Sequence, residues 1–422
     1  MPDLLTSLSA ALPVFWSNPL LNQKTQSDLP EHYEGNAIGL EAIRRAEKRF
    51  KTFAPLLAQL FPELATVNGQ IESDLVPVPA MQNALELPST CGQLWVKADH
   101  ALAVAGSVKA RGGFHEVLEV TEQISQKHNL LSLEDDILSL LQAPAREVFS
   151  QYQIAVGSTG NLGMSIGVMA AALGFRAVVH MSSEAKNWKK TRLRSLGVQV
   201  VEHFGDYEQA VFQGRLLAES DPLCHFVDDE RSTSLFLGYA ASAFHFQKQL
   251  QERCIQVDAG HPLCLYIPCG VGGAPSGIAW GLHHVFGRHV RCYFAEPVQS
   301  PCFLVQMLTG MTKHPSIYDF GLNNRTEADG LAVPRASLLA AECMKSILAG
   351  VFTVEDATLF QHLQLLFSTE GIRIEPSAAA GFSGIRWLAD KCNPLTTQVV
   401  WTTGGSLVPD AEFQKFLAWP RF

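Results

Sequence analysis

The sequence predicts an α/β protein with two lobes, each containing a mostly parallel sheet flanked by helices. Short apolar runs typical of buried strands alternate with helical patterns between residues 153 and 227, and a second alternation runs from 263 to 401. Such alternation places consecutive strands in one parallel sheet with helices on its faces. The chain has 422 residues, of which 47% are hydrophobic and 17% charged, which suffices for a large core.

The elements are expected in the following order. Residues up to about 93 are helical or irregular, with helices at 42–50 and 53–61 and no visible chemistry, and a strand at 94–99 follows. We predict a small α/β domain at 148–232 and a large domain formed by 1–147 plus 233–422, with the ligand in the cleft between them. The small domain has expected strands at 153–156, 177–180, 198–201 and 225–227, and the large domain at 263–267, 290–295 and 398–401.

Composition excludes several classes of protein. The formal net charge of −9 argues against nucleic-acid binding. The nine cysteines form no CxxC pair and no zinc-ligand spacing, so reduced thiols in a cytoplasmic enzyme are expected. The N-terminus lacks the basic region of a signal peptide. Residues 154–175 carry no charge, but their five glycines and polar Ser158 and Asn161 indicate a strand, a loop and a buried helix instead of a membrane span.

Lys109 is the first candidate for chemistry. It follows Gly106 and Ser107 and precedes Phe114 and further apolar residues at helical spacing, so it lies in the first turn of a helix with Ser107 as the expected N-cap. The positive end of the helix dipole disfavours an ammonium there, and a neutral amine is what forms Schiff bases. Taken alone, Lys109 is better explained as a surface lysine that follows a turn.

A glycine-rich turn between a strand and a helix is the second candidate, formed by Gly270, Val271, Gly272 and Gly273. Glycines there let backbone N–H groups approach an anion at the helix N-terminus, and the phosphate of a mononucleotide-sized cofactor is the natural ligand. A dinucleotide fingerprint GxGxxG fails at Pro275, although Glu296 ends the next strand. A simple tight turn is the third interpretation, and an ATP P-loop is excluded because its GxxxxGK[ST] pattern is absent.

Two further polar loops follow strands. Ser158, Thr159, Gly160 and Asn161 open a helix, where hydroxyls and amides suit a substrate carboxylate, although Ser, Thr and Asn are also ordinary capping residues. Ser165 lies in a GxSxG pattern but falls inside the helix, so it is not a hydrolase nucleophile. Thr403 follows the last strand, where its hydroxyl can face a ring nitrogen. Together, an amine, an amide donor, a phosphate loop and a neutral hydroxyl match the needs of pyridoxal 5'-phosphate (PLP).

These four features in this order resemble the fold-type II, tryptophan synthase β-like family of PLP enzymes, and within it the bacterial D-serine dehydratases (D-serine ammonia-lyases). The resemblance covers about residue 65 to the end. Two departures adjoin the site: residues 101–105 read Ala-Leu-Ala-Val-Ala where the family usually has His-Leu-Pro-Ile-Ser, and Ser406 replaces a common glycine. The matching stretches are 69–75, 79–82, 106–113, 157–163, 188–190, 228–230, 235–239, 270–273, 295–297, 300–302, 328–333, 371–377 and 403–405.

The resemblance implies a role for each candidate. Lys109 forms the Schiff base with PLP, Asn161 contacts O3', the 270–273 loop binds the phosphate and Thr403 lies beside N1. Ser158, Thr159, Gly160 and Asn161 hold the substrate carboxylate. The implied reaction is the β-elimination of D-serine to pyruvate and ammonia, in which either Lys109 or, on the opposite face of the substrate, Thr159 or a water removes the α-proton.

Several expectations remain open at this point. The alternatives are a PLP lyase for another hydroxy amino acid such as D-threonine or L-serine, a catalytically silent PLP-binding relative and a nicotinamide-dependent dehydrogenase. The resemblance also implies a monomer and a monovalent cation, K⁺ or Na⁺, near the phosphate loop, with Glu296 as a guess for one ligand. No nucleic acid or membrane partner is expected.

Overall fold

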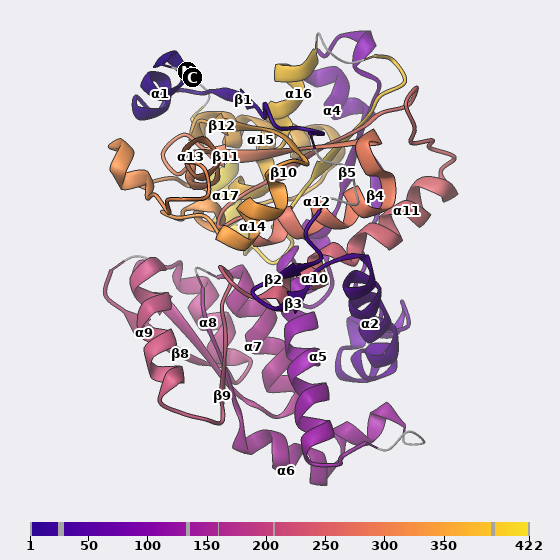
Figure 1. Cartoon of the computed structure of the whole chain (residues 1–422), viewed down its shortest axis with the longest axis vertical. Helices are drawn as coiled ribbons and strands as arrows, with labels where there is room; N and C mark the ends of the chain where they lie inside the picture. Colours follow the sequence, from indigo (N-terminus) through magenta and orange to yellow (C-terminus); the bar gives the residue numbers. More distant parts are fainter. Residues whose placement is uncertain are drawn as a thin grey trace.

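The computed structural model describes residues 2–23, 29–131, 136–158, 160–205, 207–389 and 393–420. They form two lobes, the larger at the top and the smaller at the bottom of Figure 1. The large lobe contains a seven-stranded sheet and the small lobe a four-stranded sheet. A short antiparallel pair, β2 (His32–Tyr33) and β3 (Asn36–Ala37), is separate from both. The predicted two-lobe α/β architecture is confirmed.

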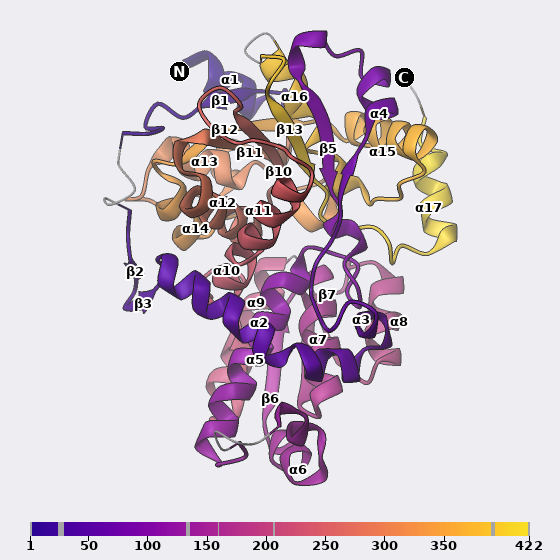
Figure 2. The same cartoon turned by 90° about the vertical axis from the view of Figure 1, so that its right-hand side faces the viewer.

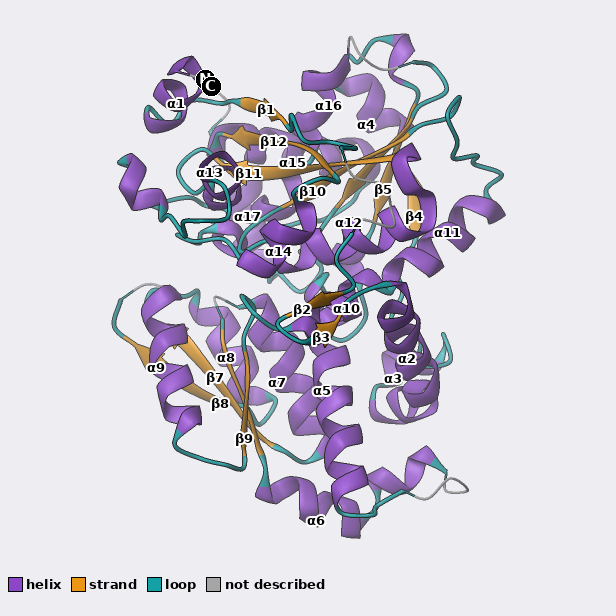
Figure 3. Cartoon of the chain, viewed as in Figure 1, coloured by secondary structure: helices purple, strands orange, loops and turns teal. Residues whose placement is uncertain are grey.

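The large sheet has the strand order β1-β12-β11-β10-β13-β5-β4. Its five central strands are parallel, and the edge strands β1 and β4 are antiparallel to their neighbours. Parallel strands that are covered on both faces are apolar throughout, and every residue of β10 is buried. Helices cover the sheet, as the purple ribbons in Figure 3 show. The strands are β1 (Phe15–Ser17), β4 (Leu75–Pro77), β5 (Gln93–Lys97), β10 (Leu263–Pro268), β11 (Val290–Pro297), β12 (Leu348–Val354) and β13 (Thr397–Trp401).

The small sheet has the order β8-β7-β6-β9, with all neighbours parallel. It consists of β6 (Gln153–Gly157), β7 (Arg176–Ser182), β8 (Gln199–His203) and β9 (Cys224–Val227). The uncharged stretch 154–175 is the predicted strand, loop and helix, formed by β6 and α7. Across the described part of the chain, no helix combines the length and apolar character needed to cross a membrane.

Helix α5 connects the two lobes. It begins at Lys109, where the preceding Val108 N–H donates to Thr403 O after β13 of the large sheet, and it packs along α7 of the small lobe, so closely that a Cβ on Gly113 would lie 2.2 Å from Ser165 Oγ. The domain boundaries at 148 and 232 stay a prediction. The helices are α1 (Pro2–Ser9), α2 (Leu40–Leu60), α3 (Pro62–Ala65), α4 (Pro79–Ala84), α5 (Lys109–Lys127), α6 (Ala143–Gln151), α7 (Asn161–Leu173), α8 (Asn187–Ser195), α9 (Tyr207–Glu219), α10 (Thr233–Ala240), α11 (Ser242–Glu252), α12 (Gly273–Phe286), α13 (Cys302–Thr309), α14 (Leu338–Met344), α15 (Asp356–Glu370), α16 (Phe382–Leu388) and α17 (Asp410–Leu417).

The structure differs from the sequence-based expectation at one N-terminal helix and at one C-terminal strand. The helices expected at 42–50 and 53–61 are one helix, α2, which contains Pro55. Its buried residues, among them Ile43, Phe53 and Leu57, supply the packing that offsets the hydrogen bond a proline removes. Figure 2 shows α2 running across the outside of α5 and α10. Strand β12 was not predicted, because its continuous apolar run cannot be told from a buried helix by periodicity.

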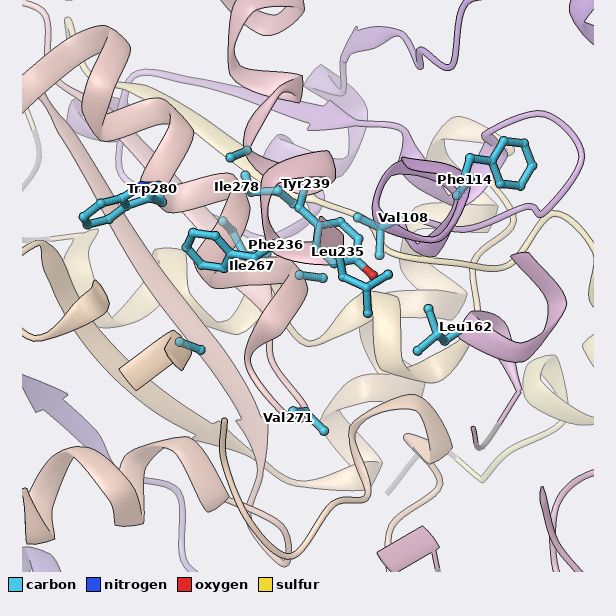
Figure 4. Close-up of a cluster of buried hydrophobic side chains, with 14 of the residues drawn as sticks. Val108, Phe114, Leu162, Leu235, Phe236, Tyr239, Ile267, Val271, Ile278 and Trp280 are labelled. Atoms are coloured by element: carbon cyan, nitrogen blue, oxygen red, sulfur yellow. The ribbon is translucent and has the colours of Figure 1, made fainter. Parts of the chain in front are cut away.

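One hydrophobic cluster passes beneath the cleft and joins the lobes. Helices α10 and α12 approach so closely that a Cβ on Gly277 would lie 2.5 Å from Phe236 O. Burial of such side chains is the main favourable term in folding. The cluster therefore gives the cleft a rigid base. Figure 4 shows part of it, with Val108, Leu162, Phe236, Tyr239, Ile278 and Trp280 labelled.

Buried histidines predict a loss of stability in acid. Burial lowers the pKa of His100 and of His362 to about 4. Between pH 6.5 and about 4 the unfolded chain therefore binds protons that the folded chain does not, so stability falls as the pH falls, by roughly 1.4 kcal/mol per pH unit for each histidine. Urea unfolding at pH 7, 6 and 5 measures this slope. His362→Gln should reduce the slope by the share of one histidine, whereas a substitution at exposed His32 should leave it unchanged.

Candidate active site

A cavity lies where strands of both sheets end. The residues that follow β6, β10 and β13 line it together with the first turn of α5. In open α/β sheets, ligands bind at the carboxyl ends of parallel strands. Gly160 and Gly273 are neighbours of lining residues, and Thr159 lies outside the described residues. The predicted site residues that line the cavity are Lys109, Ser158, Asn161, Gly270, Val271, Gly272 and Thr403.

Lys109 is the first residue of α5, and its side chain is 20% exposed at the cavity. Its Nζ lies 2.8 Å from Asp229 Oδ2 and 5.8 Å from the centre of the Tyr239 ring. The other oxygen of Asp229 is buried, and none of the described residues donates a hydrogen bond to it. Asp229 thus holds the amine of Lys109 at the cavity and keeps one acceptor free.

A second lysine, the buried Lys97, differs from Lys109 in the number of hydrogen bonds that its ammonium group donates. Its ammonium donates to Glu72 Oε1, to the carbonyl oxygen of Ser73 and to Gln249 Oε1. An ammonium has three N–H donors, and all three are used here. Lys97 is therefore a saturated structural cation, whereas Lys109 can offer its nitrogen to a ligand.

The start of α5 is set by the loop after β13. Ser107 pairs with Gly404 in an isolated β-bridge, and Val108 N–H donates to Thr403 O over 2.8 Å. The predicted N-cap role of Ser107 is wrong: Val108 occupies the cap position, and Ser107 Oγ is buried without a described partner. Because the Thr403 backbone supplies this contact, Thr403 and Lys109 are held on neighbouring sides of the cavity.

The 270–273 loop turns directly into α12. Gly272 has φ +105°, and a Cβ there would lie 2.6 Å from a ring carbon of Phe303. Only glycine fits such a position without strain. Val271 O accepts from Ser337 N over 2.8 Å, which fixes the loop. The first turn of α12 therefore faces the cavity with an anion-binding N-terminus, as a phosphate requires.

The 158–161 loop begins α7. Ser158 Oγ accepts from Gly160 N at 3.0 Å and from Gly163 N at 2.8 Å, so it performs the capping that its residue type favours. Its own O–H remains available as a donor at the cavity. Gly160 has φ +156°, which again favours glycine. The Nδ2 of Asn161 donates to Glu375 Oε1 over 2.7 Å.

Sequence reasoning did not assign roles to several residues of the cavity. Asp229, Gly330, Glu375 and Ser377 line it, and Gly330 N donates to Ser377 Oγ. Burial raises the pKa of Glu375. All four belong to stretches that match the resembling family, but their distance along the chain from Lys109 gave no sign that they share one cavity.

Glu296 has a structural role in the chain. Its carboxylate accepts from Phe303 N at 2.7 Å and Leu304 N at 2.9 Å and so caps α13. Burial raises its pKa to about 8, against the opposing effect of these hydrogen bonds. Within the ranges that the structure describes, no cluster of three or more His, Cys, Asp or Glu side chains could bind a metal ion.

The chain matches the family model described as pyridoxal-phosphate dependent enzyme over residues 69–404. The chain belongs to this family. The match favours PLP over the nicotinamide alternative, and the cavity fits this cofactor: it offers an amine at Lys109, a glycine cradle at Gly272, an amide at Asn161 and a hydroxyl residue at Thr403. PLP is therefore the cofactor of the chain, while the role of each residue remains a proposal.

Individual relatives agree with the predicted resemblance. The chain is 54% identical over 426 residues to a probable D-serine dehydratase of Acidovorax ebreus, covering 97% of this chain and 94% of the relative. Among solved structures, it resembles the diaminopropionate ammonia lyase of Escherichia coli in complex with D-serine, with TM-score 0.75 and 17% identity over 96% and 97% of the two chains. A serine racemase from Dictyostelium discoideum has TM-score 0.64 at 16% identity, covering 88% of this chain and 99% of its own. The solved structures confirm the tryptophan synthase β-like, fold-type II architecture.

Proposed function

We propose that this chain catalyses the PLP-dependent β-elimination of D-serine to pyruvate and ammonia. The observation that carries the proposal is the convergence, in one cavity, of Lys109, Asn161, the 270–273 loop and Thr403. The relative at 54% identity, named a probable D-serine dehydratase, supports the choice of substrate. The proposal includes a small domain at 148–232 and a large domain formed by 1–147 plus 233–422, with the cofactor in the cleft between them.

Each residue has a defined task toward the cofactor. Lys109 would supply the amine that binds the PLP aldehyde, and the 270–273 loop with the start of α12 would hold the phosphate. Asn161 would donate to O3', and Thr403 would give N1 a neutral partner. When bound, PLP supplies an electron-accepting ring that stabilises the charge left on Cα after loss of its proton.

The substrate is held by the 158–161 loop. Ser158 O–H and the backbone N–H groups at the start of α7 donate to the carboxylate of D-serine, at the positive end of the helix dipole. Asp229 keeps the Lys109 amine in place through its 2.8 Å contact. The base that takes the α-proton is Lys109 if the Cα–H faces it, and Thr159 or a water if it faces the other side.

The decisive experiment compares substrates on the purified, PLP-loaded protein. The visible absorption spectrum is recorded before and after D-serine, while pyruvate is measured in parallel. We expect a cofactor band that changes on addition of D-serine. Pyruvate should form faster from D-serine than from L-serine, and D-threonine should be converted more slowly than D-serine. A band without pyruvate would indicate a silent relative, and faster turnover of L-serine or D-threonine would reassign the substrate.

Ser158→Ala tests the substrate loop. We expect the KM for D-serine to rise about 10- to 100-fold, because a hydrogen bond to a charged group contributes roughly 1.5–3 kcal/mol. Ser165→Ala is the matched control: Ser165 lies inside α7, and its hydroxyl donates to Leu162 O. Steady-state kinetics of both variants are the measurement, and an unchanged KM for Ser158→Ala would contradict the role of this loop.

The proposal also includes a monomeric enzyme in the cytoplasm that uses a monovalent cation, K⁺ or Na⁺. The eight cysteines in the described residues are free thiols, as a reducing compartment would leave them. Replacing K⁺ or Na⁺ by a bulky organic cation during the assay tests the cation requirement.

A further inference from the structure

Two side chains of the small lobe reach carboxylates of the large lobe beside the cavity. Lys189, on α8, places its Nζ 2.9 Å from Oδ2 of Asp329. Asn161, at the start of α7, donates to Glu375. The Lys189 side chain is 2% exposed. A second charged pair between the lobes, Arg335–Glu208, has side chains that are 36% and 43% exposed, so it is screened by water.

Lys189 forms the floor of the 158–161 loop. A Cβ built on Gly160 would lie 2.4 Å from Lys189 Cδ and 2.9 Å from its Nζ. The backbone of Gly160 therefore packs directly against the lysine side chain, and a side chain at position 160 would collide with it.

Asp329 belongs to the opposite wall of the cavity. The next two residues, Gly330 and Leu331, line the cavity, and Gly330 N donates to Ser377 Oγ over 3.2 Å. The Lys189–Asp329 pair thus joins the loop of the small lobe to a cavity wall of the large lobe.

The charges of this group favour a persistent ion pair. Burial lowers the pKa of Lys189, but Asp329 and Glu375 outweigh it and the net shift is upward. Burial also opposes ionisation of Asp329, but Lys189 and Lys186 hold its pKa below the usual value. Both partners stay charged, and removal of either leaves a buried charge without its partner.

The adjacent lysine provides an internal comparison. Lys190 is as buried as Lys189, and its Nζ lies 2.7 Å from both Glu202 Oε2 and Ser183 O. Both partners belong to the small lobe. Two neighbouring buried lysines of one helix therefore have ion-pair partners in different lobes: Asp329 of the large lobe for Lys189, and Glu202 of the small lobe for Lys190.

We propose that Lys189 is a positioning residue that, through Asp329, ties the substrate loop to the large lobe and holds the cleft closed over the substrate. It acts through Gly160 and touches no reacting atom. This inference rests on the proposed function for its substrate, and on the family's cofactor for its second readout.

The test compares Lys189→Met, Asp329→Asn, their combination and Lys190→Met in the PLP-loaded protein. We expect the KM for D-serine to rise at least about tenfold in the two single variants, with kcat changed less than about threefold, because a misplaced positioning group costs mainly productive binding. The combined variant should be no worse than the poorer single variant, since both remove the same tie. Lys190→Met should keep the wild-type KM.

A second measurement does not depend on turnover. Hydroxylamine reacts with the bound cofactor only when it can enter the cleft, so the rate at which it bleaches the cofactor band reports opening. We expect this rate to rise at least about tenfold in Lys189→Met and Asp329→Asn and to stay unchanged in Lys190→Met, with thermal unfolding confirming that each variant is folded.

Equal effects in Lys190→Met, or wild-type KM and bleaching rates in Lys189→Met, would overturn the inference. If the wild-type protein forms no pyruvate from D-serine, the proposed function fails, and the bleaching rates alone still decide whether Lys189 holds the cleft.

Discussion

Lys109→Ala is expected to abolish the visible cofactor band and to lower pyruvate formation from D-serine by at least about 10³-fold, the scale of losing a group that binds the cofactor and can also move a proton. The reason is geometric. Lys109 is the residue at the cavity whose amine pairs with one carboxylate and keeps donors to spare, whereas the buried Lys97 uses all of its donors. Absorbance and a coupled pyruvate assay measure the two effects.

The control for this experiment lies on the same helix. Lys127, in the last turn of α5, is exposed and contacts Tyr152, far along the helix from the cavity. Lys127→Ala should keep both the band and the activity. A Lys109→Ala protein that retained the band and formed pyruvate at more than a few per cent of the wild-type rate would exclude Lys109 as the cofactor-binding amine.

Arg111→Met is expected to lower the free energy of unfolding by about 3–5 kcal/mol, the cost of leaving buried carboxylates unpaired. Arg111 is 3% exposed and donates to both oxygens of Asp99, at 2.7 and 2.8 Å, and to Glu72 Oε1 at 2.6 Å. Burial would raise the pKa of Glu72, but Arg111 and Lys97 hold it well below its usual value. Urea unfolding at pH 7 measures the loss.

The same change should weaken cofactor binding. Asp99 Oδ2 also accepts from the indole N–H of Trp401 over 2.7 Å. Arg111 and Asp99 therefore connect the first turn of α5, which carries Lys109, to the end of β13, which precedes Thr403. Arg44→Met removes an exposed pair with Glu41 on α2 and should cost less than about 1 kcal/mol. A loss of similar size in both variants would mean that the buried network contributes little.

The sequence predicted the local backbone correctly where the residue type itself sets the backbone geometry. The 270–273 loop and the helix after it follow from glycines at a strand end, and Gly272 does adopt the positive φ that such a turn needs. Ser107 shows the limit: its type predicted a cap, but a bridge to Gly404, about 300 residues away in sequence, sets the start of α5 instead. Cap preferences are local, and a contact with a segment far away in the sequence can override them.

The ion-pair and hydrogen-bond partners of the site residues, in contrast, could not be predicted from the sequence. Asp229 beside Lys109, Glu375 beside Asn161 and Asp329 beside Lys189 are contacts between segments far apart in sequence. No periodicity encodes them, because each depends on how the two lobes meet.

The sequence by itself thus determined the two-lobe α/β fold and, through the family resemblance, the cofactor, and it supplied the residues that we propose to contact the cofactor. Strand alternation, helix starts and glycine turns are set over a few residues. Only the tertiary structure decided which carboxylates hold those residues in place and that Lys189 ties the lobes together while Lys190 does not. The physical reason is that burial and charge pairing arise from packing across the whole chain, and two adjacent lysines of one helix have ion-pair partners in different lobes.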